Sequence, residues 1–438
     1  MSDSRLTDRR GGLLVLGLVA PLGGLGAGMI GALFRMALIE ADRLREALIS
    51  WAQSGFFGFV LVVLACAAGT GVAAWLVRRF APPASGSGIP QVEGVLNSEM
   101  EPAPPRLLAV KFFGGVLAIG SGLALGREGP SVQMGANIAY EAGKLFRRNW
   151  EDCRVLLAAG AGAGLATAFN APIAGAVFVL EELVKRFEPR IAIAALGASA
   201  AAIWVSRSLL GNAPDFSVGP LIHAGFRIGP LFLLLGICAG LIGIFFNQTL
   251  LRALGTADRL AMLPAELRAA VVGAAVGALA WFAPGLVGGG DPLTARALAG
   301  EGAIAVIPFL FLLRLGLGAV SYAAGTPGGI FAPLLVLGAE LGLWFGKICA
   351  FALPGLVIQP EGFAVVGMAA LFTAIVRAPL TGIVLVTEMT ANVTMLLPMI
   401  AACFAAMLVP TLLGNMPIYD SLRARLSVHR ERAAKQKN

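Results

Sequence analysis

The chain has 438 residues, of which 58% are hydrophobic and 13% are charged. Ordinary soluble domains are about 45–50% hydrophobic and about 25% charged, so the composition excludes a typical soluble enzyme and predicts a membrane protein. The formal net charge of +8 does not indicate nucleic acid as a partner, because the basic residues cluster at the chain ends and in short loops, as in membrane proteins with positively charged cytoplasmic segments.

A polar start is followed by long apolar stretches. Residues 1–10 carry three arginines, and we expect them to form a cytoplasmic N-terminal segment. The apolar stretch 11–38 has no small-residue cleavage site behind it, so we interpret it as a retained membrane helix rather than a signal peptide. Further apolar stretches lie at residues 56–78, 107–125, 155–180, 190–211, 227–251, 268–287, 303–324, 328–353 and 363–410. Several are interrupted by glycine, proline or a lone charge, which is tolerated at membrane depth only where the backbone lines a cavity or packs on protein.

Two segments of the chain resemble each other. Residues 158–183 (AAGAGAGLATAFNAPIAGAVFVLEEL) align with residues 365–390 (VVGMAALFTAIVRAPLTGIVLVTEMT) without a gap. The alignment superimposes an Ala-Pro pair, two glycines and one glutamate, since Glu181 meets Glu388. This self-similarity indicates an internal repeat.

A second pair of motifs gives the extent of the repeat. GREGP at 126–130 and GIFAP at 329–333 lie upstream of the first pair at nearly the same offset. We therefore expect two homologous membrane halves, at residues 11–210 and 225–420, joined by a linker at residues 211–224.

The basic residues at both chain ends suggest the orientation. The tail at residues 421–438 carries six basic residues, so the positive-inside rule places both ends in the cytoplasm, which requires an even number of crossings. An odd number of crossings in each half would make the halves antiparallel, with a binding site at the midplane between broken helices. The expected fold is an all-α polytopic membrane protein of two inverted-topology repeats with many tilted and broken helices.

GSGIP, at residues 86–90, is a candidate anion-binding motif. It follows a turn-prone segment at the edge of an apolar stretch. Its glycines expose backbone N–H groups, and the Ser87 hydroxyl can donate a further hydrogen bond to an anion. The alternative is an ordinary loop in which serine or glycine caps a helix.

GREGP places a carboxyl group and a guanidinium group in an apolar environment, directly before an expected helix. An ionisable residue inside a membrane is a functional-site candidate, and a helix N-terminus offers unpaired N–H groups and partial positive charge. Glu128 could therefore lodge its carboxylate where a substrate anion binds, and act as a gate that moves aside when protonated. Alternatively, Glu128 pairs with Arg127 or caps the helix.

The second half repeats this frame. GTPGGIFAP at residues 325–333 has Phe331 where the first half has Glu128. A second helix N-terminus aimed at the same point would complete an anion site without a full positive charge, from which an ion can leave quickly. Taken alone, the segment would indicate a tight turn before a core helix.

Together these motifs resemble the CLC family of chloride channels and proton/chloride antiporters. GSGIP, GREGP and GGIFAP occur in the family's order, with VKFFGG at 110–115 before the second and MPIYDSL at 416–422 near the end. The likeness covers roughly residues 15–425. Only a short basic tail follows it, so we expect the bacterial type, without nucleotide-sensing domains.

The resemblance implies a chloride site. The hydroxyls of Ser87 and Tyr419 and the backbone amides of Ile330 and Phe331 would bind a central chloride, and the amides of Gly86 and Ser87 would face an inner site. Serine in GSGIP matches the chloride-selective pattern of the family, whereas nitrate-preferring members have proline there. The intact GREGP and the terminal tyrosine argue against the fluoride-exporting branch.

The resemblance also implies two proton-carrying glutamates: Glu128 as the external gate and Glu182 as the internal proton-transfer residue. The repeat supports Glu182 over Glu181, because Glu181 aligns with Glu388 whereas Glu182 aligns with Met389. Successive helical residues point about 100° apart, so both cannot face one pathway. The alternative is that Glu182 is a solvated charge at a helix end.

Three basic residues lie in apolar stretches outside these roles. Lys111 either contributes positive potential to the anion path or reaches the membrane interface with its ammonium group. Arg314 and Arg377 match no binding motif, and we expect them to form structural ion pairs, with Glu340 and Glu388 as candidate partners.

The main prediction is therefore a proton-coupled chloride antiporter in the lipid bilayer of the inner (plasma) membrane, with both termini cytoplasmic; the family resemblance implies that it is a homodimer. A passive voltage- or pH-gated chloride channel on the same fold is the alternative.

We expect no enzyme, because GxSxG, HExxH and a pair of membrane aspartates are absent from the sequence. A transporter of amino acids with inverted repeats is a further alternative, but its binding site would need an anionic partner for the substrate's ammonium group. Five scattered cysteines and only two histidines predict neither a disulfide framework nor a metal site, and no cofactor.

Overall fold

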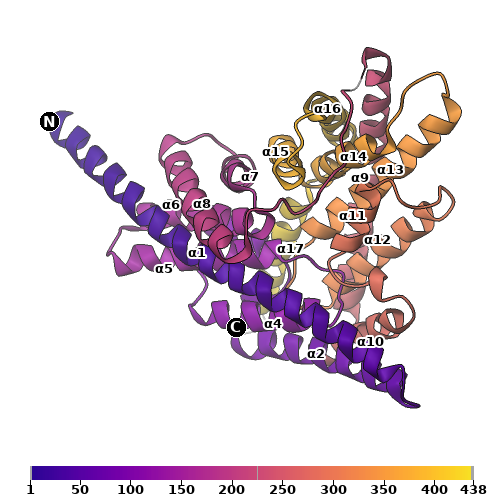
Figure 1. Ribbon diagram of the computed structural model, residues 1–438. Coiled ribbons are helices and arrows are strands. Elements are labelled where there is room, and N and C mark those ends of the chain that lie inside the picture. Colours follow the sequence, from indigo (N-terminus) through magenta and orange to yellow (C-terminus); the bar gives the residue numbers. More distant parts are fainter. Residues whose placement is uncertain (1, 224, 436–438) are drawn as a thin grey trace.

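The computed structural model describes residues 2–223 and 225–435 of the chain. Within these ranges it contains seventeen α-helices and only isolated β-bridges. The first half comprises α1 (Ser2–Ala52), α2 (Gly58–Phe80), α3 (Ile89–Leu96), α4 (Arg106–Gly120), α5 (Glu128–Leu145), α6 (Trp150–Phe169), α7 (Pro172–Phe178) and α8 (Pro189–Leu210). The second half comprises α9 (Gly229–Arg259), α10 (Ala265–Phe282), α11 (Asp291–Leu298), α12 (Ile307–Ala323), α13 (Phe331–Ala352), α14 (Pro360–Val376), α15 (Pro379–Thr390) and α16 (Leu396–Leu412), and α17 (Ile418–Lys435) follows. The two halves lie side by side, with α17 between them (Figure 1).

The helices differ widely in length. In the described part of the chain, seven are long and apolar enough to cross a membrane. By contrast, α3 and α11 have 8 residues each, or about 12 Å at 1.5 Å per residue, which is less than half of the ~30 Å hydrocarbon core of a bilayer. The prediction of an all-α polytopic protein with broken helices is confirmed.

Both halves have the same order of elements. In each, a long helix and a second helix are followed by a 3₁₀ turn, at Pro82–Ala84 and Pro284–Leu286, and then by an eight-residue helix. The five helices that follow also correspond one to one. The repeat predicted from the sequence is therefore a repeat of structure.

A reciprocal contact reveals how the halves are related. Gly126 donates its N–H to the carbonyl of Gly329 at 2.8 Å, and Gly329 donates its N–H to the carbonyl of Gly126 at 2.7 Å. These two glycines are equivalent in the repeat, and each donates to the other. Such an exchange between equivalent residues requires a two-fold relation, as at an isologous interface. The predicted inversion of the two repeats accounts for this geometry.

A second reciprocal contact joins α7 and α15, which lie next to each other in the upper middle of Figure 1. The Glu181 carboxylate accepts N–H groups of Leu380 and Thr381 at the start of α15, at 3.0 and 2.6 Å. The equivalent Glu388 accepts those of Ile173 and Ala174 at the start of α7, at 3.1 and 2.8 Å. Each carboxylate thus satisfies the unpaired amides of a helix in the other half.

Glycines allow neighbouring helices to approach closely. A Cβ atom on Gly135 of α5 would lie 2.3 Å from the carbonyl oxygen of Gly160 in α6. In the second half, a Cβ atom on Gly338 of α13 would lie 2.6 Å from the carbonyl oxygen of Gly367 in α14. Much of the high glycine content therefore serves helix packing, as is common in membranes.

Some element boundaries differ from those expected. Helix α1 begins at Ser2 and includes nine of the ten residues expected to precede the first membrane helix; residue 1 lies outside the described ranges. The apolar stretch 363–410, one of the interrupted stretches, contains three helices, α14 to α16. Its first break follows Arg377, which has the positive φ of 73° and precedes Ala378-Pro379, because proline cannot continue a helix.

Candidate ion pathway

Three glycine-rich loops meet between the halves. A Cβ atom on Gly129 of GREGP would lie 2.4 Å from Oγ of Ser87 in GSGIP, and one on Gly329 of GGIFAP would lie 2.9 Å from the amide nitrogen of Gly129. A parallel bridge joins Gly86 to Pro327. The three motifs, which are far apart in the sequence, therefore form one site.

Two buried hydroxyl groups in this site are unpaired. Oγ of Ser87 and the phenol oxygen of Tyr419 have no hydrogen-bond partner among the described residues. The Tyr419 ring stacks on Phe331, with centroids 5.9 Å apart. An unsatisfied buried polar group costs about 1–3 kcal/mol, and an anion that accepts a hydrogen bond from each hydroxyl would remove this cost. Ser87 thus lies beside Gly129 at the start of α5, and Tyr419 lies beside Phe331 at the start of α13.

Helix α13 contributes backbone donors at the same place. It begins at Phe331, so the first N–H groups of the helix have no acceptor within it and carry partial positive charge. Ile330 immediately precedes this helix start, and both residues are buried. The geometry is suited to an anion, the role that the family resemblance implies for these amides.

The Glu128 carboxylate occupies part of this donor site. Glu128 is the first residue of α5 and is 1% exposed. Its Oε2 accepts the N–H of Ala332 in the first turn of α13, at 3.4 Å, and lies only 1.9 Å from the position of a Cβ atom on Gly126. The carboxylate therefore folds back over a glycine and places its own charge at a helix N-terminus of the other half. The guanidinium of Arg127 pairs with Asp215 and Asp291 instead.

One predicted amide donor is already engaged. The Gly86 N–H donates to the carbonyl of Thr326 at 3.0 Å, so it is not free for an anion, contrary to the expectation. The Ser87 N–H makes a longer contact of 3.4 Å with the phenol oxygen of Tyr322. Tyr322, Ser85 and Gly86 line one end of a cavity of about 520 Å³. Tyr322 was not predicted, because no motif contains it.

Lys111 does not reach the membrane interface, which was one of the two roles considered for it. It is fully buried, and its ammonium donates to the carbonyls of Ala84 and Gly86 at 3.0 and 2.7 Å. These contacts fix the turn that leads into GSGIP and direct its carbonyl oxygens toward the lysine.

Arg314 fixes the corresponding turn in the second half. Its guanidinium donates to the carbonyls of Leu286 and Gly288 at 2.9 and 3.0 Å, which are the equivalents of the Lys111 acceptors. The turn that it holds, GGGDP at residues 288–292, is thus the counterpart of GSGIP. Glu340 interacts with this guanidinium electrostatically, but the hydrogen bonds go to backbone carbonyls.

The predicted pairing of Arg377 is wrong. Its guanidinium donates to the carbonyl of Asn415 at 3.1 Å, whereas Glu388 caps α7. Asn247 donates to the side-chain oxygen of Asn415 at 3.0 Å and to the carbonyl of Met416 at 3.2 Å. Arg377 and Asn247 together hold the segment that leads into α17, and so help to place Tyr419.

Glu182 and its neighbour Glu181 have different roles. Glu181 is committed to capping α15, as the repeat indicated. Glu182 lies in a π-helical turn, Val179–Leu183, is 2% exposed, and its Oε1 is unpaired within the described residues. π-Helical turns occur frequently at functional sites, and a buried carboxyl with one oxygen unpaired suits proton transfer.

Sequence reasoning missed a second buried acid beside Glu182. Glu93 in α3 is fully buried, neither of its carboxyl oxygens has a donor among the described residues, and it interacts with Glu182. The signal was present, because Glu93 is an ionisable residue in an apolar segment only six positions after Ser87.

These two acids lie directly beneath a charged surface. Lys185 pairs with Asp420 at 2.7 Å, and the Arg423 guanidinium lies 4.0 Å from the Glu93 carboxylate. The surface side chains are partly exposed, so a proton has a short way from solvent to Glu182. No group of three metal-binding side chains was found in the described ranges.

The antiparallel halves and the buried site at their junction define a polytopic membrane transport protein built from inverted repeats. A family model described as "Voltage gated chloride channel" matches residues 69–411. The chain belongs to this family, the CLC family.

Individual relatives cover nearly the whole chain. It is 42% identical over 431 residues to the H(+)/Cl(-) exchange transporter ClcA of Cronobacter sakazakii, covering 95% of this chain and 91% of the relative. It is 40% identical over 445 residues to the transporter of the same name in Salmonella paratyphi B, covering 99% and 94%. The crystal structure of a slow cyanobacterial Cl-/H+ antiporter superimposes with a TM-score of 0.90 at 33% identity, over 94% of this chain and 98% of the other.

Proposed function

We propose that the protein exchanges chloride for protons across a membrane. The observation that carries the proposal is that two unpaired buried hydroxyls, on Ser87 and Tyr419, lie beside the starts of α5 and α13, and that the Glu128 carboxylate accepts an N–H in the first turn of α13. A site of hydroxyl and amide donors binds an anion without a full positive charge, and Glu128 competes for it. The relatives reported above, whose names state H+/Cl- exchange, support the same function.

In the proposed mechanism the central chloride accepts hydrogen bonds from Ser87, Tyr419 and the amides of Ile330 and Phe331. Gly86 contributes the turn at φ 64° that presents the neighbouring Ser87, rather than its own amide. When Glu128 takes a proton, its carboxyl loses its attraction to the α13 N-terminus, and chloride can take its place. Chloride binding and proton uptake are thereby linked thermodynamically.

The proton leaves this gate toward the other side of the membrane through Glu182. Its buried carboxyl, with Oε1 unpaired, and its position under the charged surface support this role. Glu93 stands beside Glu182, and like charges repel strongly in a poorly polarisable surrounding, so a proton held by one carboxyl stabilises the pair.

The proposal includes the setting of the protein. Both termini lie in the cytoplasm, the protein is inserted in the inner membrane, and residues 11–210 and 225–420 work as two membrane repeats around one pathway. The linker 211–224 then lies on the outer side. Two copies associate as a homodimer, each with its own pathway; light scattering of the purified protein in detergent should give twice the chain mass of 45.0 kDa.

Coupled flux in proteoliposomes tests the function. A chloride gradient should drive protons against their own gradient, and external pH should change with the direction of chloride flow. Passive chloride flux without proton movement would instead indicate a chloride channel on this fold, and would refute exchange.

Two substitutions test the assigned residues. Glu128→Ala should keep chloride flux but remove its coupling to protons, because the competing carboxylate is lost. Glu182→Gln should suppress proton transport selectively. Glu181→Gln is the matched control: it removes the neighbouring charge, yet its carboxylate only caps α15, so proton coupling should persist. Normal proton pumping by Glu182→Gln would disprove its role.

A further inference from the structure

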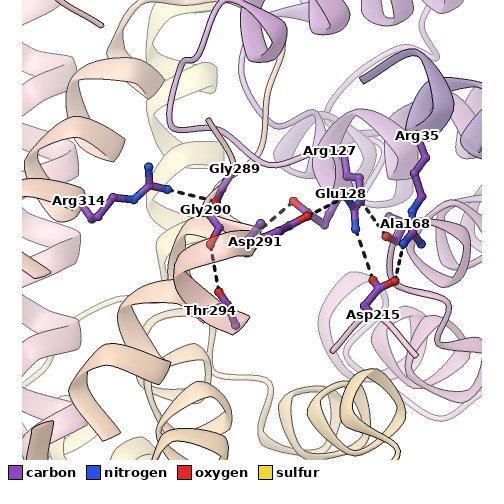
Figure 2. A network of polar contacts seen from close by, with 11 residues as sticks. Arg35, Arg127, Glu128, Ala168, Asp215, Gly289, Gly290, Asp291, Thr294 and Arg314 are labelled. Atoms are coloured by element: carbon purple, nitrogen blue, oxygen red, sulfur yellow. Dashed lines mark hydrogen bonds and ion pairs between the residues drawn. The ribbon is translucent and has the colours of Figure 1, made fainter. Parts of the chain in front are cut away.

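The arginine next to the gate is held by several distant segments. Nε of Arg127 donates to the carbonyl of Ala168 at the end of α6, at 3.0 Å. One terminal nitrogen pairs with Asp291 at the start of α11, at 3.2 Å, and the other pairs with Asp215 at 3.4 Å. Figure 2 shows these carboxylates on either side of the guanidinium, with Glu128 beside it. All the guanidinium nitrogens of Arg127 are therefore occupied by groups other than Glu128.

Asp215 belongs to the linker between the two halves, outside every helix. Its side chain is only 4% exposed, and it also accepts a hydrogen bond of 2.6 Å from Arg35 in α1. A buried carboxylate in a connecting loop costs desolvation energy unless it is paired. Here it is paired twice, with Arg35 in α1 and with Arg127 directly before α5, so the linker is fixed directly beside the gate.

We propose that Asp215 is a positioning residue that holds Arg127 beside Glu128 and sets how strongly the outer entrance attracts chloride. The inference deepens the proposed function, since it assigns the linker a part in the same pathway. Its basis is charge and geometry: two arginines and two aspartates form one network, so their charges cancel.

Changing one member of this network unbalances it by one charge. Without the Asp215 charge, Arg127 keeps its own charge but loses one of its partners, and the entrance becomes more positive. Without Arg35, Asp215 neutralises Arg127 more completely, and the entrance becomes less positive. A unit charge about 10 Å from an ion, in partly solvated surroundings, changes the affinity for a monovalent anion by about twofold to fourfold.

The experiment measures chloride affinity separately on each side of the membrane. Initial rates of radioactive chloride uptake are recorded against chloride concentration in right-side-out and in inverted membrane vesicles. Asp215→Asn should lower the KM for external chloride about twofold to fourfold, and Arg35→Gln should raise it by a similar factor. The double variant should return to within about 1.5-fold of the wild type, because the charges cancel again. The KM for internal chloride should stay unchanged.

Asp152→Asn is the matched control. Asp152 is 2% exposed and also pairs with two arginines, Arg148 and Arg190, both at 2.6 Å. It lies in the first turn of α6, whereas Ala168 lies at the other end of this helix, about 24 Å away along the axis. The same chemical change at this distance should leave the external KM unchanged.

Opposite shifts from Asp215→Asn and Arg35→Gln distinguish electrostatic positioning from mere support of the fold, because loss of support moves both variants in the same direction. Shifts of the same sign, equal shifts on both sides of the membrane, or no shift in either variant would overturn the proposal. The outcome does not depend on proton coupling, since chloride uptake alone is measured. A failure of exchange would appear instead as uncoupled flux in the wild type.

Discussion

Tyrosine is rare in this chain, and its three tyrosines differ in their relation to the anion site. The Tyr419 hydroxyl is buried without a partner among the described residues, and the Tyr322 oxygen accepts the Ser87 amide at 3.4 Å. Tyr140 lies elsewhere along the wall of the cavity that Tyr322 lines. Replacing each with phenylalanine removes a single hydroxyl and therefore tests each role separately.

We expect Tyr419→Phe and Tyr322→Phe to have opposite effects on halide affinity, measured by isothermal titration with chloride and bromide. Tyr419→Phe removes a donor to the anion and should weaken binding about fivefold, since one hydrogen bond contributes about 1 kcal/mol. Tyr322→Phe leaves the Ser87 amide without its acceptor, so the anion becomes the better partner and binding should tighten by a similar factor. Tyr140→Phe should bind as the wild type does. Weaker binding by Tyr322→Phe would show that this phenol donates to the anion instead.

Motif residues could be predicted from the sequence, but their partners could not. Ser87, Glu128 and Tyr419 stand in short segments whose chemistry is local. The contacts of Lys111 reach back 25 and 27 residues to the turn before GSGIP, and Asp215 joins residues 180 and 88 positions away. No period or motif encodes such distances; only the packed halves bring these groups together.

At the scale of helices, the reciprocal caps should contribute to stability rather than to transport. Glu388→Ala leaves the N–H groups of Ile173 and Ala174 without their acceptor, which should lower the free energy of unfolding by about 1–2 kcal/mol. The measurement is thermal unfolding of the purified protein in detergent. Coupled chloride and proton flux should be retained by the folded protein, and a loss of proton coupling at unchanged stability would contradict this structural role.

Close helix packing makes a second prediction about elements. Gly135→Ala places a methyl group 2.3 Å from the Gly160 carbonyl oxygen, so α5 and α6 must move apart. We expect a loss of stability of about 1–3 kcal/mol and, because Glu128 starts α5, weaker halide binding. Gly316→Ala in α12 is the control, since no heavy atom lies within 4 Å of a Cβ atom there. Equal thermal stability of the two variants would argue against the close approach.

For the whole molecule, the sequence predicted the repeat from aligned segments, and its inversion only from the charges at the chain ends. Aligned segments look the same whether two halves are parallel or inverted. The charges at the chain ends were compatible with an inverted arrangement but did not require it. The mutual hydrogen bonds of Gly126 and Gly329 require a two-fold relation. GGGDP at 288–292 could have been recognised as the partner of GSGIP from its offset, but its sequence carries neither serine nor isoleucine.

Inverted halves have a consequence for topology that can be measured. If each half crosses the membrane an odd number of times, the linker lies on the opposite side from both termini. Single cysteines at the exposed positions Gly219 and Val428, in a background without the five native cysteines, report the two sides. A membrane-impermeant maleimide should label Gly219→Cys in intact cells with the outer membrane removed, and Val428→Cys only after permeabilisation. Labelling of both from the outside, or of neither, would exclude antiparallel halves with odd crossings. Protection of Gly219→Cys from the outside would also place Asp215 away from the outer entrance.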